Sequence, residues 1–339
     1  MTDEMKAKRE LLFSGSKNGY DRVDQQTLDA MEAYCRDYKS FLDHSKTERE
    51  AVKSAILRAE KEGFVAFDPK KTYKAGDKVY YNNRGRAAVF AVIGKRGASE
   101  GLRIAAAHID SPRIDLKQNP MYEDSGFCLM KTHYYGGIKK YQWTTIPLAL
   151  HGVVVLRDGS KVTVNIGEKP GDPVFYINDL LPHLAKEQAQ QVLGKAIAGE
   201  DLNIVVGGLP YPDEEVKEKI KLNVLSELNE KYGMTEEDFL SAEIAAVPAF
   251  NARDIGFDRA FIGAYGHDDR VCAYPTLTAI LDSKDDDRTV LAILVDKEEI
   301  GSEGNTGMQC CVFNDIIDAI AAEFGVSAAK VRAASKCLS

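Results

Sequence analysis

Two adjacent carboxylates, Glu298 and Glu299, come shortly after a continuous apolar run at residues 289–295. Such a run predicts a strand that is buried on both faces. Carboxylates at the end of a buried strand are costly unless a metal ion, a basic partner or open water compensates them. Because neighbouring residues of a strand point to opposite sides, we expect one glutamate to bind a metal and the other to transfer a proton. The alternative is an acidic turn without chemistry.

Two further clusters have the same setting. His108 and Asp110 end a run of small apolar residues, and Asp268 and Asp269 follow a short expected strand. Ligands of open α/β sheets gather at the carboxyl ends of the strands, and His, Asp and Glu are the ligands of hydrolytic zinc or manganese centres. His108 and Asp110 should face one side, so that one binds metal and the other orients it. Three such clusters favour a metallohydrolase.

Other sequence motifs for catalysis are absent. The sequence has no phosphate-binding loop and no Gly-x-Ser-x-Gly, and the lack of His-Glu-x-x-His excludes a thermolysin-type peptidase. The glycine-rich residues 301–307 have the wrong spacing for a dinucleotide. We expect His133 and His151 to be sheet-surface or core residues, and His267 to support Asp268.

The composition is that of a globular protein. The 339 residues are 44% hydrophobic and 28% charged, and the length suits about two domains. The net charge of -8 disfavours a nucleic-acid partner. No apolar run approaches the roughly 20 residues of a membrane span, and no signal peptide begins the sequence. Six cysteines without Cys-x-x-Cys favour reduced thiols and a cytoplasmic location.

The pattern of elements predicts an α/β protein in two units. We expect residues 1–112 and 241–339 to form one discontinuous unit that carries the three clusters, and residues 113–240 to form an inserted, β-rich unit. In the insert, the pattern predicts a helix from Asp213, as its N-cap, to Tyr232. The stretch 175–194 is expected to begin extended and to continue as a polar helix.

Three motifs resemble the aspartyl aminopeptidase family, the dinuclear zinc metallo-aminopeptidases of metallopeptidase family 18. They are residues 108–112 (HIDSP), 266–272 (GHDDRVC) and 296–302 (DKEEIGS). Residues 135–138 (YGGI) with Trp143, and 181–184 (LPHL), also match. The similarity extends over essentially the whole chain, with the motifs in order, and is closest to the bacterial branch. It implies a mixed-sheet, zinc-exopeptidase-like catalytic domain with an inserted dimerisation domain.

The resemblance implies a role for each residue of the clusters. It makes His108 a ligand of one metal ion, Glu299 a ligand of the other, and Asp268 a bridge between the two. Asp110 would orient His108, and Glu298 would be the general base that takes a proton from the bridging water, which attacks as hydroxide. The two divalent ions would be zinc, with manganese or cobalt as alternatives.

The resemblance also implies an assembly. His183, in the insert, would reach the active site of a neighbouring subunit and stabilise the tetrahedral intermediate. Dimers formed through residues 113–240 would assemble into a tetrahedral dodecamer. The family has two further metal ligands that do not occur before Ser339, so we expect a fragment of a longer protein that by itself binds metals poorly and is weakly active.

The sequence leaves three functions open. The leading prediction is an aminopeptidase that removes N-terminal residues from peptides, acidic residues among them. A dinuclear deacylase would cleave N-acyl amino acids and ignore free N-terminal amines. A non-catalytic assembly protein would keep the fold and lose turnover. The preferred N-terminal residue and the native metal do not follow from the sequence.

Overall fold

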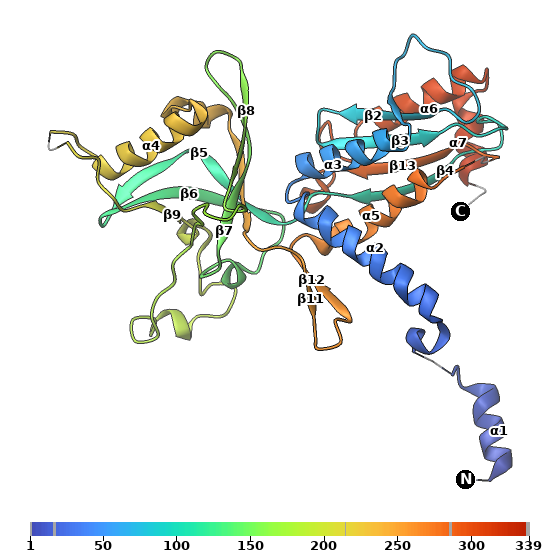
Figure 1. The fold of residues 1–339 in the computed structure, drawn as a ribbon, viewed down its shortest axis with the longest axis horizontal. Coiled ribbons are helices and arrows are strands. Elements are labelled where there is room, and N and C mark those ends of the chain that lie inside the picture. Colours follow the sequence, from blue (N-terminus) through green and yellow to red (C-terminus); the bar gives the residue numbers. More distant parts are fainter. Residues whose placement is uncertain (1, 16–17, 214, 285–286, 337–339) are drawn as a thin grey trace.

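Two units lie side by side, each built around its own β-sheet (Figure 1). The computed structural model describes residues 2–15, 18–213, 215–284 and 287–336. The first unit contains helices α1 (Asp3–Leu12), α2 (Gln25–Asp43), α3 (Glu48–Lys61), α5 (His267–Leu281), α6 (Val312–Glu323) and α7 (Ala328–Lys336), and strands β1 (Val65–Ala66), β2 (Lys78–Asn83), β3 (Ala87–Val92), β4 (Arg103–His108) and β13 (Val290–Val295).

The sheet of the first unit is mixed and has the order β1-β2-β3-β13-β4. Strand β13 is parallel to β4 and antiparallel to β3. Its side chains alternate between two cores: Ala292 and Leu294 pack with α2, α3 and α5, whereas Leu291 and Ile293 pack with α6 and α7. The prediction of a strand buried on both faces is therefore confirmed. The α/β fold class is confirmed as well.

The second unit is a six-stranded sheet with the order β8-β7-β10-β5-β6-β9. Its elements are β5 (Arg113–Asp124), β6 (Phe127–Tyr135), β7 (Leu148–Val155), β8 (Lys161–Ile166), β9 (Ile204–Gly207), α4 (Lys219–Tyr232) and β10 (Glu243–Pro248). Strand β10 pairs with β5 and β7. The sheet thus extends to Pro248, past residue 240, where we expected the insert to end. A hairpin of β11 (Arg253–Ile255) and β12 (Phe261–Gly263) follows.

Two helix predictions in the second unit were wrong in part. Helix α4 ends before Gly233 as expected but begins at Lys219. The Asp213 carboxylate accepts a hydrogen bond from the Glu215 amide and caps no helix. In the stretch 175–194 the helical element is the short 3₁₀ helix η3 (Gln188–Gln190). Apolar side chains of the stretch 175–194, such as Leu184 and Leu193, are exposed. No tertiary packing therefore stabilises a longer helix there.

No helix among the described residues is long and apolar enough to cross a membrane. Five cysteines are free thiols: Cys35, Cys128, Cys272, Cys310 and Cys311. The sixth, Cys337, lies outside the described residues.

A buried histidine joins the two units. His151, on β7, is 2% exposed. Its Nδ1 lies 2.8 Å from Glu50 Oε1 on α3, and its Nε2 lies 3.2 Å from Glu168 Oε1. Lys46 Nζ is 4.0 Å from the same Glu168 oxygen. Burial lowers the pKa of His151, but the two carboxylates raise it by more, to about 9. The expectation of a sheet or core histidine is confirmed, with an ion-paired role that the sequence did not indicate.

We expect His151 to make the stability of the protein depend on pH. A histidine whose pKa rises on folding from 6.5 to about 9 stabilises the protein fully below pH 6.5 and loses this contribution as the pH rises through 9. The predicted loss is about 3 kcal/mol of unfolding free energy. Urea unfolding across this range should show the loss for the unaltered protein and a flatter profile for His151→Gln.

The matched control for this experiment is His133→Gln, because the His133 side chain, in the same sheet, is 57% exposed. It should retain the pH dependence of the unaltered protein. Equal pH profiles for His151→Gln and the unaltered protein would show that the histidine is not charged in the folded state.

Candidate metal centre

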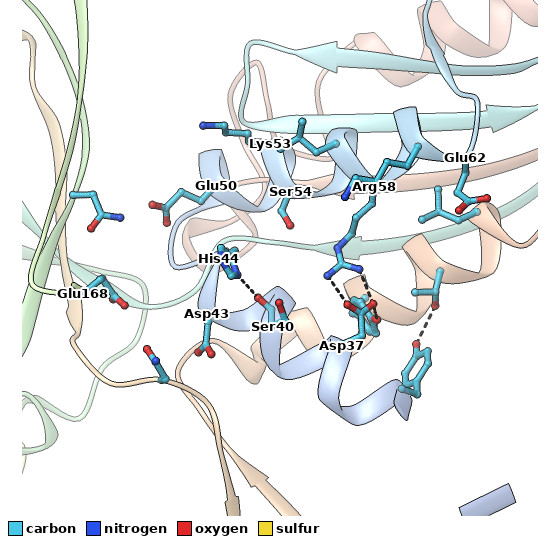
Figure 2. A pocket seen from close by; sticks show the side chains of 18 of the residues that line it. Asp37, Ser40, Asp43, His44, Glu50, Lys53, Ser54, Arg58, Glu62 and Glu168 are labelled. Atoms are coloured by element: carbon cyan, nitrogen blue, oxygen red, sulfur yellow. Dashed lines mark hydrogen bonds and ion pairs between the residues drawn. The ribbon is translucent and has the colours of Figure 1, made fainter. Parts of the chain in front are cut away.

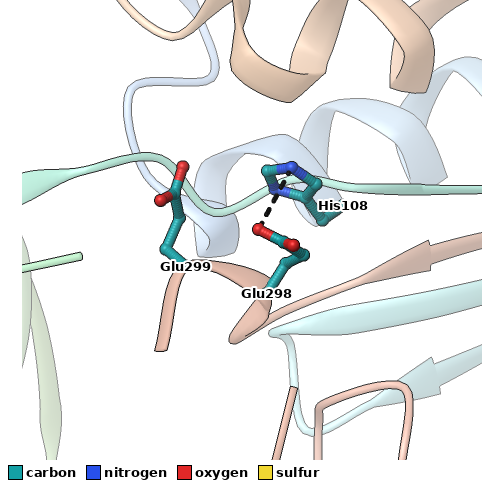
Figure 3. A group of neighbouring side chains, drawn as sticks. All are labelled: His108, Glu298 and Glu299. Atoms are coloured by element: carbon teal, nitrogen blue, oxygen red, sulfur yellow. Dashed lines mark ion pairs between the residues drawn. The ribbon is translucent and has the colours of Figure 1, made fainter. Parts of the chain in front are cut away.

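His108, Glu298 and Glu299 meet at one edge of the first sheet (Figure 3), and Asp268 approaches the histidine there. His108 Nε2 lies 3.3 Å from Asp268 Oδ1 and 3.6 Å from Glu298 Oε2. One ligand atom from each of His108, Glu298 and Glu299 lies within 4.8 Å of the others. One imidazole and two carboxylates therefore surround a common point, and the Asp268 carboxylate lies beside the same imidazole.

The direction of the strands explains this meeting. Because β4 and β13 are parallel and His108 is opposite Val295 in the register, both strands end at the same edge of the sheet. After β13 the chain turns through Lys297, with φ of 68°, into the short 3₁₀ helix η6 (Glu298–Ile300). The two glutamates therefore do not alternate as on a strand. Both carboxylates reach the cluster, which corrects the expectation that they point to opposite sides.

Asp110 contacts both the histidine and the two glutamates of the cluster. This residue is fully buried, and its Oδ1 lies 3.4 Å from His108 Nδ1. Its two carboxylate oxygens also accept hydrogen bonds from the amides of Glu298 and Glu299, each at 3.2 Å. The same carboxylate thus faces the imidazole from β4 and anchors the turn after β13. Its position suits the predicted orienting role.

Asp268 reaches the cluster from the start of α5. The Ser111 hydroxyl donates a hydrogen bond to its main-chain oxygen at 2.7 Å and ties the loop after β4 to α5. The neighbouring His267 does not support Asp268, contrary to expectation. Its ring nitrogens lie 3.0 Å from the Tyr38 hydroxyl and 3.0 Å from the Ile262 carbonyl.

The charges of the cluster fit a bound cation. Burial and repulsion from Asp268 raise the pKa of Glu299 to about 7. Burial lowers the pKa of His108, but Asp110 raises it by more, to about 9. Carboxylates crowded together in this way repel one another unless a positive charge compensates them. Imidazole nitrogen and carboxylate oxygen are ligands of zinc and manganese, so the donor set suits a metal ion.

His183 is not part of this cluster. It lies exposed in the long loop between β8 and β9 of the second unit, and among the described residues the possible ligand group consists of His108, Glu298 and Glu299. Its predicted role toward a neighbouring subunit stays a prediction.

A large hollow of the protein lies elsewhere. It has a volume of about 1120 Å³ and lies beside α2 and α3 (Figure 2). Arg58 from α3 binds both carboxylate oxygens of Asp37 in this groove, at 2.6 and 2.9 Å. None of the cluster residues lines it. Glu50 and Glu168 in the same groove pair with His151, and we assign the groove no chemistry.

Comparison with known proteins identifies the family. The profile of the aminopeptidase I zinc metalloproteases (M18) matches residues 41–339. The chain belongs to this family. The probable M18 family aminopeptidase 1 of Clostridium acetobutylicum is 50% identical over 310 residues, which are 90% of this chain and 67% of that protein. The Thermotoga maritima relative is 49% identical over 278 residues, which are 82% of this chain and 60% of that protein.

Solved structures of the same family confirm the fold. The crystal structure of aminopeptidase I from Clostridium acetobutylicum has a TM-score of 0.86 and 44% identity, and covers 94% of this chain and 71% of that one. The M18 aminopeptidase from Thermotoga maritima has a TM-score of 0.86 and 43% identity, over 93% of this chain and 68% of that one. This chain thus spans 60% to 67% of the curated relatives and slightly more of the solved chains.

The sequence indicated the residues of the candidate metal centre but missed one of their neighbours. In the sequence, residues 135–138 appear only as one of the motifs that carry the family resemblance, whereas in the structure the Tyr135 hydroxyl donates a hydrogen bond to Asp110 Oδ2 at 2.8 Å. Nothing in the spacing connected this tyrosine with the aspartate.

Proposed function

We propose that this M18 protein is a metal-dependent aminopeptidase that removes N-terminal residues from peptides. The observation that carries the proposal is the meeting of His108, Asp268, Glu298 and Glu299 at one edge of the sheet. Three carboxylates share a single imidazole there, so the cluster suits divalent cations. Family membership supports peptide hydrolysis as the chemistry that these residues perform.

Each residue of the cluster has a proposed task. His108, Asp268 and Glu299 would hold the ions, and Asp110 would keep the imidazole in place. The two ions, zinc in this proposal, would polarise the scissile carbonyl and make a bound water acidic. Glu298 takes the proton from the attacking water and delivers it to the leaving amine. Its half-exposed side chain, 3.6 Å from His108, is accessible to substrate.

We also propose that the second unit mediates assembly into dimers and then a dodecamer, with His183 contributing to a neighbouring active site. The exposed position of His183 in a long loop is compatible with contact to another subunit. A yeast protein of this fold, at 20% identity and a TM-score of 0.66, is described as a dodecamer.

Hydrolysis of chromogenic amides tests the function. Aspartyl, glutamyl and leucyl amides are offered with zinc, with manganese or with a chelator, to this chain and to the longest form of the protein that contains it. We expect hydrolysis that is lost on chelation and restored by metal, because the cluster without a cation neither polarises the carbonyl nor activates water.

The same amides with an acetylated amine separate the alternatives. An aminopeptidase should leave them intact, whereas a deacylase should cleave N-acyl amino acids and ignore free amines. Absence of hydrolysis under every condition, with intact oligomers, would contradict the proposal and favour an assembly protein.

A further inference from the structure

The end of strand β6, in the second unit, contacts the metal centre of the first unit. Tyr135 is the last residue of β6 and is 8% exposed. Its hydroxyl donates a hydrogen bond of 2.8 Å to Oδ2 of Asp110, the oxygen that also accepts the Glu299 amide. One carboxylate therefore connects β4, the turn after β13 and the second unit.

The next residue touches a proposed ligand itself. Gly136 has a φ of 71°, and a Cβ atom at this position would lie 3.0 Å from Glu299 Cβ and 3.1 Å from Glu299 Oε2. The backbone at Gly136 thus packs closely against the Glu299 side chain. A larger residue would have to displace that carboxylate, and the left-handed φ adds strain for any residue with a Cβ.

Tyr135 is in turn fixed by a buried cation. The guanidinium of Arg113 lies 4.0 Å from the centre of the Tyr135 ring. Arg113 pairs with Asp115 at 2.7 Å in its own strand and with Glu48 at 3.2 Å in α3 of the first unit. Arg113 is held by these two carboxylates, and the Tyr135 ring packs against Arg113. The Tyr135 hydroxyl therefore has little freedom to move away from Asp110.

We infer that Tyr135 and Gly136 are positioning residues of the metal centre, through which the second unit sets the geometry of Asp110 and Glu299. The inference rests on the proposed metal-dependent function. It gives the second unit a task within its own chain, in addition to any part in assembly. Partners of metal-ligating groups typically change metal affinity about 10–100-fold when they are removed.

Zinc affinity of four variants tests this inference. Zinc dissociation constants are measured by competition with a chromogenic chelator for Tyr135→Phe and Gly136→Ala, each made in the longest form of the protein that contains this chain. We expect zinc binding about 10-fold weaker, or more, in each. The matched controls are Tyr134→Phe and Gly137→Ala. Tyr134 is 49% exposed, and nothing lies within 4 Å of a Cβ on Gly137. Both controls should bind zinc as the unaltered protein does.

Thermal unfolding of the metal-free proteins separates positioning from folding. A merely structural role would lower the unfolding temperature without weakening zinc binding by the folded protein. Unchanged zinc affinity in both Tyr135→Phe and Gly136→Ala, with normal binding by the unaltered protein, would overturn the inference and leave the proposed function standing. Failure of the unaltered longest form of the protein to bind zinc would overturn both.

Discussion

Replacing Glu298 with glutamine is expected to lower kcat about 10²–10⁴-fold, the contribution typical of a general base. Glutamine keeps the shape and the hydrogen-bonding reach of the side chain but cannot take a proton. Zinc affinity should change little, because His108, Asp268 and Glu299 are the proposed ligands. The experiment therefore measures kcat, KM and the zinc dissociation constant of Glu298→Gln together.

The two readouts decide between the roles that the geometry allows. Glu298 lies within 4.8 Å of His108 and Glu299 and is placed well enough to bind metal itself. A loss of zinc affinity that parallels the loss of kcat would make it a ligand instead of a base. Unchanged kcat would exclude both roles. Glu303→Gln is the matched control, because Glu303 is exposed in the loop that follows.

Replacing Arg86 with methionine is expected to destabilise the protein by about 3–5 kcal/mol, the usual result of leaving a buried charge without its partner. The charge concerned is that of Asp296, because Glu48 keeps its ion pair with Arg113. Arg86 lies between three carboxylates, 3.0 Å from Asp296, 2.7 Å from Glu48 and 3.4 Å from Glu243. Asp296 and Glu48 are at most 4% exposed. Asp296 begins the turn that carries the two glutamates, and its Oδ1 accepts the Lys297 amide at 2.8 Å. Urea unfolding measures the loss.

A second substitution tests the physical reason. If the uncompensated Asp296 carboxylate causes the loss, Arg86→Met combined with Asp296→Asn should recover part of the unfolding free energy. The control Arg84→Met changes an exposed arginine in the same hairpin and should lie within about 0.5 kcal/mol of the unaltered protein. A double variant less stable than Arg86→Met alone would show that Asp296 stabilises the turn mainly as a hydrogen-bond acceptor.

The sequence by itself indicated the core strand and most residues of the candidate metal centre. A strand of consecutive apolar residues buries all of its side chains only when it lies between two packed layers. Residues 290–295 accordingly form a strand with a core on each face. Clusters that follow parallel strands must meet at one edge, which brought His108 to the glutamates after β13. The strand itself follows from the run of consecutive apolar residues, whereas the parallel pairing of β4 and β13 is a property of the sheet.

The tertiary structure alone decided how the two units join at the site. Tyr135 and Asp110 are in contact although a whole strand of the second unit separates them in the chain, and His151 finds its carboxylates on α3 and after β8. Strand β10 lies between β7 and β5 in the second sheet, although β8 and β9 come between β7 and β10 in the sequence. No local pattern encodes such pairings, because they arise when two separately formed surfaces bury their polar groups against each other and each buried group must find a partner there.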